Sequence, residues 1–229
     1  MTQTLIIAMP THDSRAVIQS LLELLQVSQD LARPVWVVTS EVSNIPRARN
    51  LVLDRIRDRV PATDHPWVLW VDSDIVIPLD SHRVIAGALR WAEEHNRAIT
   101  ANYLMGSGVS VLMKSRDPTK AHHYTARELD ALPPYAEVGM SGFGFLYLRQ
   151  PLDYTFHADR VGEDVHFWWD YPETRLFYAR QIPLGHKKFV LLSSGPQTDP
   201  GLNHTNQQAK QPVRDLQPRM NRQTRRHPR

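Results

Sequence analysis

The fold is decided by one stretch of sequence, Trp67-Val68-Leu69-Trp70-Val71-Asp72-Ser73-Asp74. Its first five residues are large or β-branched and apolar, which is typical of a strand buried on both faces. Asp72 and Asp74 follow where this strand ends, and two carboxylates at such a place are costly unless a cation compensates them. Their oxygen atoms suit Mg²⁺ or Mn²⁺ bridging phosphates. The stretch therefore predicts a divalent metal site, with a turn cap at Asp74 and a solvated Asp72 as the alternative.

Apolar, β-branched runs alternate with helical periodicity on the N-terminal side of this stretch and just beyond it. We expect strands at residues 4–9, 35–39, 67–71 and 98–101, and helices from about residue 14, from residue 43 or 44, and over about 81–94. This alternation predicts an α/β fold, a single Rossmann-like domain whose mostly parallel sheet is flanked by helices. Ligands of such sheets bind beyond the carboxyl ends of the strands, where Asp72 lies.

The pattern changes after residue 102. We expect a strand at 109–113, a polar loop at 114–124, a short helix near 125–132, strands at 145–148 and 176–179, and an aromatic helix from 162 through 169. The predicted domain therefore covers residues 1–193, and the change of pattern divides it into halves at 1–102 and 103–193. Residues 194–229 are rich in Gln, Pro and Arg and are expected to form an irregular tail.

Charge is unevenly distributed along the 229 residues, whose formal net charge is +3. From Asn203 onward, Asp215 is accompanied by seven basic residues: Lys210, Arg214, Arg219, Arg222, Arg225, Arg226 and Arg229. The tail thus carries +6, and the rest of the chain carries 20 basic against 23 acidic residues. Such a tail suggests an anionic partner, either nucleic acid or membrane phosphate, or else serves only to keep the protein in solution.

Two further features bear on location. The chain has no cysteine, which excludes disulfides and thiolate metal sites and fits the cytoplasm, or the host cytoplasm for a phage protein. No apolar run approaches the roughly 20 residues of a membrane span, and the apolar N-terminus has the length of a strand and lacks the basic start of a signal peptide.

A second motif lies about twenty residues before the acidic stretch, in Pro46-Arg47-Ala48-Arg49-Asn50. Together the two motifs resemble the GT-A glycosyltransferases, of the phage or bacterial type, in which an Ala-Arg-Asn helix precedes an Asp-x-Asp strand. The resemblance covers residues 4 to 188 and implies a nucleotide diphosphate sugar donor that lies across the strand ends with Mn²⁺ or Mg²⁺. It also implies that residues 1–102 form the nucleotide-sugar-binding half and residues 103–193 the acceptor-binding half. Independently of the family, Arg47 and Arg49 near a helix N-terminus can bind an anion, or form a solvated helix face.

The resemblance also implies donor-binding residues. It places the nucleotide base near Pro10, Thr11 and the end of the second strand at Thr39. It places the ribose and diphosphate near Arg49 and Asn50. Residues expected to bind the nucleotide sugar are Pro10, Thr11, Thr39, Arg47, Arg49, Asn50, Asp72 and Ser73.

Two later matches imply catalytic and metal-binding residues. Gly162-Glu163-Asp164 resembles the Glu-Asp element of the superfamily, so Asp164 is the expected base for the acceptor hydroxyl, with Glu163 or Asp159 as fallback. The alternative is that these acids only stabilise the first turn of a helix. Leu184-Gly185-His186 resembles the superfamily's metal-binding histidine, which implies the ligand set Asp72, Asp74 and His186.

The acceptor side is less specified. The segment Gly139-Met140-Ser141-Gly142-Phe143-Gly144 resembles the loop that shapes the acceptor pocket, so Gly142 and Phe143 are expected to bind the acceptor. Trp168 is expected to stack on a sugar or a base, with core packing as the commoner role for such a residue.

The predicted function is metal-dependent sugar transfer to an acceptor hydroxyl. A hydroxymethylated base in DNA fits the basic tail, whereas a surface glycan, a lipid, a protein or a small molecule is equally compatible with the motifs. Nucleotidyl transfer would need a Gly-rich phosphate loop after the first strand, and Pro10-Thr11-His12-Asp13 contains no glycine. A non-catalytic nucleic-acid-binding module is the third hypothesis. Inversion and retention at the sugar carbon are both compatible with these motifs, as is any oligomeric state.

Overall fold

Strands and helices alternate along the first half of the chain, as predicted. The structure is a computed structural model and describes residues 3–11, 17–61, 64–105, 107–117, 120, 122–157, 162–186 and 189–192. Its elements are β1 (Leu5–Thr11), α1 (Ile18–Asp30), β2 (Val35–Glu41), α2 (Ile45–Arg57), β3 (Trp67–Val71), β4 (Ile75–Val76), α3 (His82–His95), β5 (Ala98–Thr100), α4 (Ala126–Asp130), β6 (Tyr135–Val138), β7 (Phe145–Arg149), α5 (Glu163–Asp170), β8 (Leu176–Ala179), β9 (Leu184–His186) and β10 (Phe189–Leu192).

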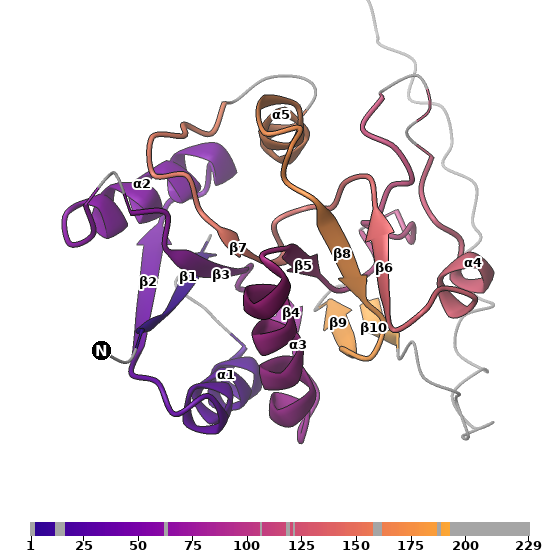
Figure 1. The fold of residues 1–229 in the computed structure, drawn as a ribbon, viewed down its shortest axis with the longest axis horizontal. Helices are drawn as coiled ribbons and strands as arrows, with labels where there is room; N and C mark the ends of the chain where they lie inside the picture. Colours follow the sequence, from indigo (N-terminus) through magenta and orange to yellow (C-terminus); the bar gives the residue numbers. More distant parts are fainter. Residues whose placement is uncertain are drawn as a thin grey trace, which may run out of the picture. The chain divides into compact units, whose positions relative to one another are not determined.

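The central sheet has seven strands in the order β2-β1-β3-β7-β5-β8-β6 (Figure 1). The pairs β1–β2, β1–β3 and β5–β8 are parallel, whereas β3–β7, β7–β5 and β6–β8 are antiparallel. The α/β class is therefore confirmed, but the sheet is mixed, because β7 and β6 run against the other five strands. A run of apolar residues has the same pattern whichever way its strand points. The sequence therefore did not predict that β7 and β6 are antiparallel to the other strands.

Helices cover both sides of this sheet, as expected (Figure 1). The first and third helices, α1 and α3, pack against each other on one side, and α2 and α5 lie on the other. Asn44 caps α2, as one of the two predicted caps, by accepting a hydrogen bond from the N–H of Arg47 (3.0 Å). Ser14, expected to cap the first helix, lies outside the described residues. Each helix in the described part of the chain is too short or too polar to span a membrane.

The second half departs further from the sequence prediction. Residues 109–113 do not form the expected strand and make only isolated bridges, from Ser110 to Leu104 and from Met113 to His123 and Met140. Two features were not predicted: strand β6 at the sheet edge and a three-stranded sheet in the order β10-β9-β4. Strands of two to four residues carry too little periodicity to be recognised. The expected tail, residues 194–229, lies outside the described residues.

The core beneath the strand ends is aromatic. Trp70 on β3 is fully buried, and its indole N–H donates to the side-chain oxygen of Gln150, which is equally buried (2.9 Å). The Trp70 ring meets Phe143 and Phe156 edge to face, with centroids 5.6 and 5.5 Å away. These rings join the central strand to the loops that precede β7 and α5.

Replacing Gln150 with Leu should destabilise the fold, because the indole N–H of Trp70 would stay buried without an acceptor. We expect the free energy of unfolding to fall by about 1–3 kcal/mol in urea denaturation. In a Trp70→Phe background, Gln150→Leu leaves no donor without an acceptor, so the free energy of unfolding should fall by less. An equal cost in both backgrounds would contradict a stabilising role for this hydrogen bond.

Candidate functional site

A tight turn at the carboxyl end of β3 presents the acidic residues. The N–H of Asp72 donates to the carbonyl of Gly144, and the N–H of Ile75 donates to the carbonyl of Asp72, both at 3.0 Å. Ser73 is 6% exposed, and its carbonyl accepts a hydrogen bond from the N–H of Val17 (3.3 Å). The predicted position of Asp72 and Asp74, at the carboxyl end of a central strand, is therefore confirmed.

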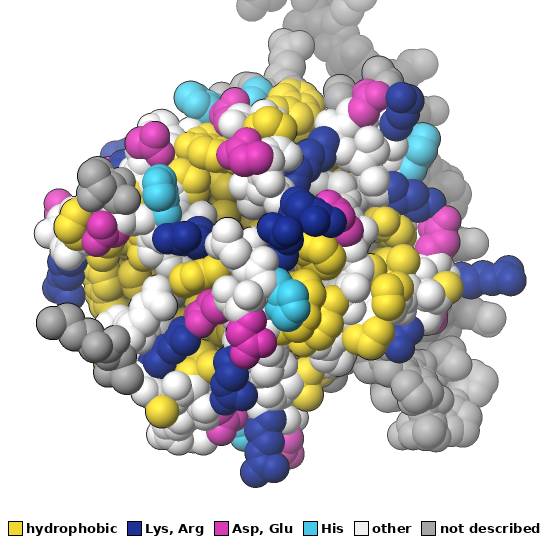
Figure 2. All heavy atoms as spheres, viewed as in Figure 1, with side chains coloured by type: hydrophobic (Ala, Val, Ile, Leu, Met, Phe, Trp, Pro, Cys, Tyr) yellow, Lys and Arg dark blue, Asp and Glu magenta, His cyan; other side chains and the backbone are white. Residues whose placement is uncertain are grey.

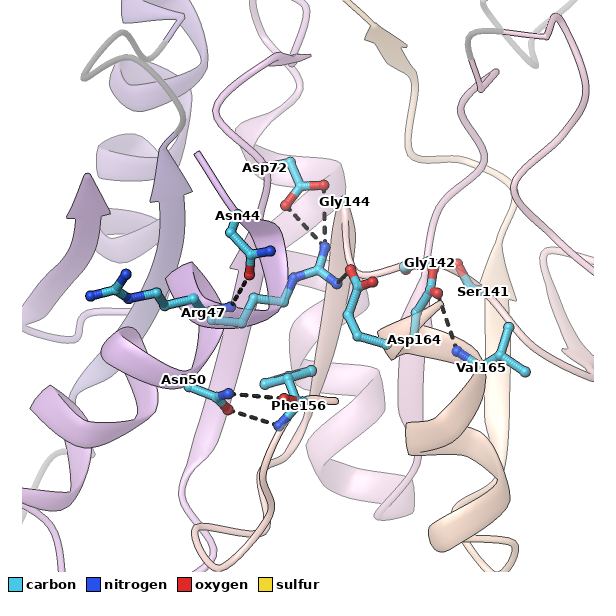
Figure 3. A network of polar contacts seen from close by, with 12 residues as sticks. Asn44, Arg47, Asn50, Asp72, Ser141, Gly142, Gly144, Phe156, Asp164 and Val165 are labelled. Atoms are coloured by element: carbon cyan, nitrogen blue, oxygen red, sulfur yellow. Dashed lines mark hydrogen bonds and ion pairs between the residues drawn. The ribbon is translucent and has the colours of Figure 1, made fainter. Parts of the chain in front are cut away.

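Arg49 lies at the centre of the site. It projects from α2, and its side chain is only 3% exposed. Its guanidinium donates to Glu163 at 2.5 Å and to the two oxygens of Asp72 at 3.3 and 3.4 Å (Figure 3). Burial disfavours the cation, but Asp72, Glu163 and Asp164 together outweigh it and raise the pKa of Arg49 above its ordinary value. The arginine therefore stays charged and joins three segments that are distant in sequence.

Aromatic rings hold the same guanidinium from the other side. The central carbon of the Arg49 guanidinium lies 5.0 Å from the ring centroid of Phe143 and 5.8 Å from that of Phe156. Phe143 is 1% exposed and Trp168 is fully buried, with its indole N–H donating to the carbonyl of Ser141 (2.7 Å). We expected Trp168 to stack on a sugar or a base and Phe143 to contact an acceptor. Both expectations are wrong for this structure, because both rings are part of the core.

The two acids at the start of α5 have different surroundings. Glu163 is bonded to Arg49, whereas one oxygen of Asp164 accepts the N–H of Val165 (3.1 Å). Burial raises the pKa of the half-buried Asp164, Arg49 opposes this rise, and Glu163 adds to it, so that the pKa lies above its ordinary 3.8. Because Glu163 is engaged by Arg49 and Asp164 has the raised pKa, Asp164 is the better candidate base. The fallback residue Asp159 lies outside the described residues.

Strand pairing brings His186 to Asp74. In the small sheet, β9 pairs with β4 so that His186 is opposite Ile75, and Nε2 of His186 lies 3.1 Å from Oδ2 of Asp74. Two donor atoms that share one cation at bonds of about 2.1 Å and a right angle lie roughly 3 Å apart. The pair therefore fits two neighbouring positions on a divalent cation, and carboxylate with imidazole suits Mn²⁺.

The third expected ligand is arranged differently. Asp72 faces Arg49, and among the residues that the structure describes no three His, Asp or Glu side chains are gathered closely enough to hold a metal ion. The complete set of Asp72, Asp74 and His186 thus stays a prediction.

Tyr103 belongs to the site and was not predicted. It is 7% exposed, its hydroxyl accepts the N–H of Gly144 (3.0 Å), and its ring stacks on that of His186 with centroids 6.2 Å apart. Burial raises the pKa of Tyr103 well above its ordinary value, and Asp72 and Asp164 raise it further. The rule that ligand sites lie beyond carboxyl strand ends would have indicated this residue, because it follows β5.

Two glycines of the predicted acceptor loop permit this packing. A Cβ on Gly142 would lie 2.9 Å from the hydroxyl of Tyr103 and 3.1 Å from a carboxylate oxygen of Asp164. A Cβ on Gly144 would clash with the Tyr103 ring and hydroxyl. The structure thus shows close packing between backbone and side chains at Gly142, and its contact with an acceptor stays a prediction.

The remaining expected donor residues are more scattered. Asn50 uses its side-chain amide to bond the main chain of Phe156, as donor at 2.9 Å and as acceptor at 2.7 Å. Arg47 is exposed and points away from Asp72 and Asp164 (Figure 3). Asn50 therefore positions the loop before α5, and Arg47 fits the alternative of a solvated helix face.

The residues expected near the nucleotide base lie at the ends of the first two strands. Pro10 and Thr11 are buried at the end of β1, and the Thr11 hydroxyl donates to the carbonyl of Ser40. On β2 the carbonyl of Thr39 accepts a hydrogen bond from Arg55. Their contact with a nucleotide stays a prediction.

Comparisons with known proteins do not add to this geometry. No protein-family model matches the chain, and no curated protein matches it. The likeness to GT-A glycosyltransferases therefore rests on the sequence motifs.

Replacing Asp164 with Asn should raise thermal stability at neutral pH. A carboxyl whose pKa is raised by folding costs stability while it is charged; the cost is full above the raised pKa and disappears as pH falls to the ordinary 3.8. We expect the melting temperature to rise by a few degrees at pH 7, at about 2–4 °C per kcal/mol, and the gain to vanish near pH 4. The exposed Asp153→Asn is the control, and a less stable Asp164→Asn at pH 7 would contradict this prediction.

Proposed function

We propose that this protein transfers a glycosyl group from a nucleotide diphosphate sugar to an acceptor hydroxyl, with Mn²⁺ or Mg²⁺. The observation that carries the proposal is the Asp74–His186 contact of 3.1 Å, made beside Asp72 at the end of the central strand. The buried cation Arg49 adjoins the carboxylate of Asp72. A metal-ligand pair and a fixed positive charge side by side suit a diphosphate.

The ion pairs of Arg49 indicate which carboxylate is free to serve the donor. Its contact with Glu163 is short, at 2.5 Å, and that with Asp72 is longer, at 3.3 Å. Asp72 can therefore turn toward a metal while Glu163 continues to neutralise the arginine. When bound, the divalent cation neutralises charge on the departing diphosphate. Asp74 and His186 would hold this cation, with Asp72 as the third ligand.

Asp164 supports the acceptor half of the reaction. In an inverting transfer the acceptor oxygen attacks the anomeric carbon, the bond from that carbon to the diphosphate breaks, and the diphosphate leaves with the bonding electrons. The hydroxyl proton passes to a carboxylate, and Asp164, whose pKa is raised above its ordinary value, is a stronger base than an ordinary aspartate. Glu163 keeps Arg49 neutralised and so positions the cluster.

DNA as the acceptor depends on the basic tail. On the face drawn in Figure 2, basic and acidic side chains of the described residues are interspersed. A phosphate backbone is bound by grouped cations, and the grouping that the sequence offers is in residues 203–229. The hydroxymethylated base in DNA therefore stays a proposal based on charge alone.

Release of nucleoside diphosphate from a panel of nucleotide sugars, with Mn²⁺, tests the proposed function. The Asp74→Asn and His186→Gln variants should each lower this release roughly 100-fold or more, since even outer partners of metal ligands cost 10- to 100-fold. Both should also bind Mn²⁺ more weakly in a spin-resonance titration, whereas the exposed His65→Gln should match the wild type. A protein that releases no nucleoside diphosphate from any nucleotide sugar would refute the proposal.

The pH profile tests the base. Activity should be lost as pH falls through the raised pKa of Asp164, so the acid limb should lie above pH 3.8. Glu163→Gln should move this limb to lower pH, because it removes a charge that raises the pKa and strengthens the opposing effect of Arg49. Asp164→Asn should lower kcat by about 10²- to 10⁴-fold. An acid limb that stays unmoved in Glu163→Gln would argue against Asp164 as the base.

A further inference from the structure

The described residues 102–105 and 107–112 form the two arms of a hairpin-like loop that begins just after β5. The N–H of Val111 donates to the carbonyl of Tyr103 (3.1 Å), Leu104 and Ser110 form an antiparallel bridge, and the N–H of Met105 donates to the carbonyl of Val109 (2.8 Å). Residues opposite each other in such a pair project to the same face. Tyr103 and Val111 therefore share one face of the loop, and Leu104 and Ser110 share the other.

The two faces of this hairpin meet different surroundings. An atom of Tyr103 and an atom of Val111 each lie 2.9 Å from the point where a Cβ of Gly142 would stand, and a carboxylate oxygen of Asp164 lies 3.1 Å from the same point. This face of the hairpin therefore adjoins Asp164. Leu104 and Ser110 line a pocket of about 410 Å³ between the hairpin and α4. The hairpin thus forms a wall between the candidate catalytic residues and a separate hollow.

The sheet sets the distance between them. Strands β3 and β5 both pair antiparallel with β7, so they run in the same direction and their carboxyl ends meet one edge of the sheet. Two strand spacings amount to roughly 9–10 Å. Asn102, at the edge of the pocket, follows β5 as Asp72 follows β3. The pocket therefore begins roughly 9–10 Å from Asp72 along the same edge of the sheet.

The pocket lining indicates the chemistry of its occupant. Its walls include Leu104, Val109 and Leu129, and of the ten described residues that line it only Asp130 is charged. At its polar end the Ser110 hydroxyl donates to the side-chain oxygen of Asn102 (2.6 Å). A phosphate or carboxylate would meet no cation among these ten residues. Pockets of 300–1,000 Å³ with apolar walls and a few polar groups are typical small-molecule sites.

We propose that this pocket binds an uncharged apolar ring or short chain, as the non-reacting part of the acceptor. Its role as an acceptor site rests on the function proposed above, because only a molecule that also reaches Asp164 is glycosylated. The pocket itself is a ligand site whether or not that function holds. The preferred acceptor is then a neutral small molecule with a hydroxyl group, and the negatively charged DNA backbone is the competing outcome.

Binding of 2-naphthol, a neutral apolar ring with one hydroxyl, tests the pocket. Ala126 is exposed on α4 and lines the pocket, so the indole of Ala126→Trp should occupy part of it. Saturation-transfer NMR should show binding to the wild-type protein and about tenfold weaker binding to this variant. The control is Ala131→Trp, at the exposed C-cap residue just after the same helix and outside the lining, which should bind as the wild type does. Absent binding, or equal binding to Ala126→Trp, would overturn the proposal.

Product analysis separates the pocket from the reaction. With an accepted donor, 2-naphthol should yield its glycoside, and Ala126→Trp should lower the ratio of transfer to donor hydrolysis about as much as it weakens binding. Transfer to hydroxymethylated duplex DNA that Ala126→Trp leaves unchanged, with none to 2-naphthol, would overturn the acceptor assignment. Binding that Ala126→Trp abolishes, without nucleoside diphosphate release from any donor, would support the pocket and refute the proposed function.

Discussion

Burying a guanidinium is costly unless carboxylates neutralise it, and the arrangement of this site follows from how that cost is met at Arg49. The arginine is 3% exposed and holds Glu163 and Asp72, which come from the start of α5 and the end of β3. The faces of Phe143 and Phe156 complete its surroundings. The same contacts therefore fold the second half of the chain onto the first and gather the acidic residues, so that stability and site geometry depend on one side chain.

This shared dependence separates three carboxylates by role. Glu163 is fixed by its 2.5 Å contact with Arg49, whereas Asp72 makes a longer contact and can exchange it for another cation. For Asp164, burial raises the pKa by more than the electrostatic attraction of Arg49 lowers it, so its pKa stays raised. In the proposed function, the three carboxylates around this buried cation would serve as a positioning acid, a movable metal ligand and a candidate base. Removing the cation would disturb all three, which makes the acids the more informative residues to replace.

Sequence reasoning located what local pattern controls. The position of Asp72 and the cap at Asn44 follow from a buried strand and from helix-start chemistry, and both are confirmed. The direction of β7 and the partners of Asn50 and Trp168 depend on contacts between distant segments, which no local pattern encodes. The pairing of β9 with β4 is of the same kind: the motif indicated His186, and only the tertiary structure shows its contact with Asp74.

One residue, Gly144, connects the hairpin to the turn that carries Asp72. Gly144 accepts the N–H of Asp72 on its carbonyl and donates its own N–H to the hydroxyl of Tyr103, so the acidic turn and the hairpin are bonded to the same backbone unit. Lacking a Cβ, Gly144 lets the Tyr103 ring approach this closely. The far face of the hairpin, with Leu104 and Ser110, lines the pocket. The main chain of Asp72 is therefore positioned by its hydrogen bond to Gly144, and side chains that line the pocket can vary without breaking that bond.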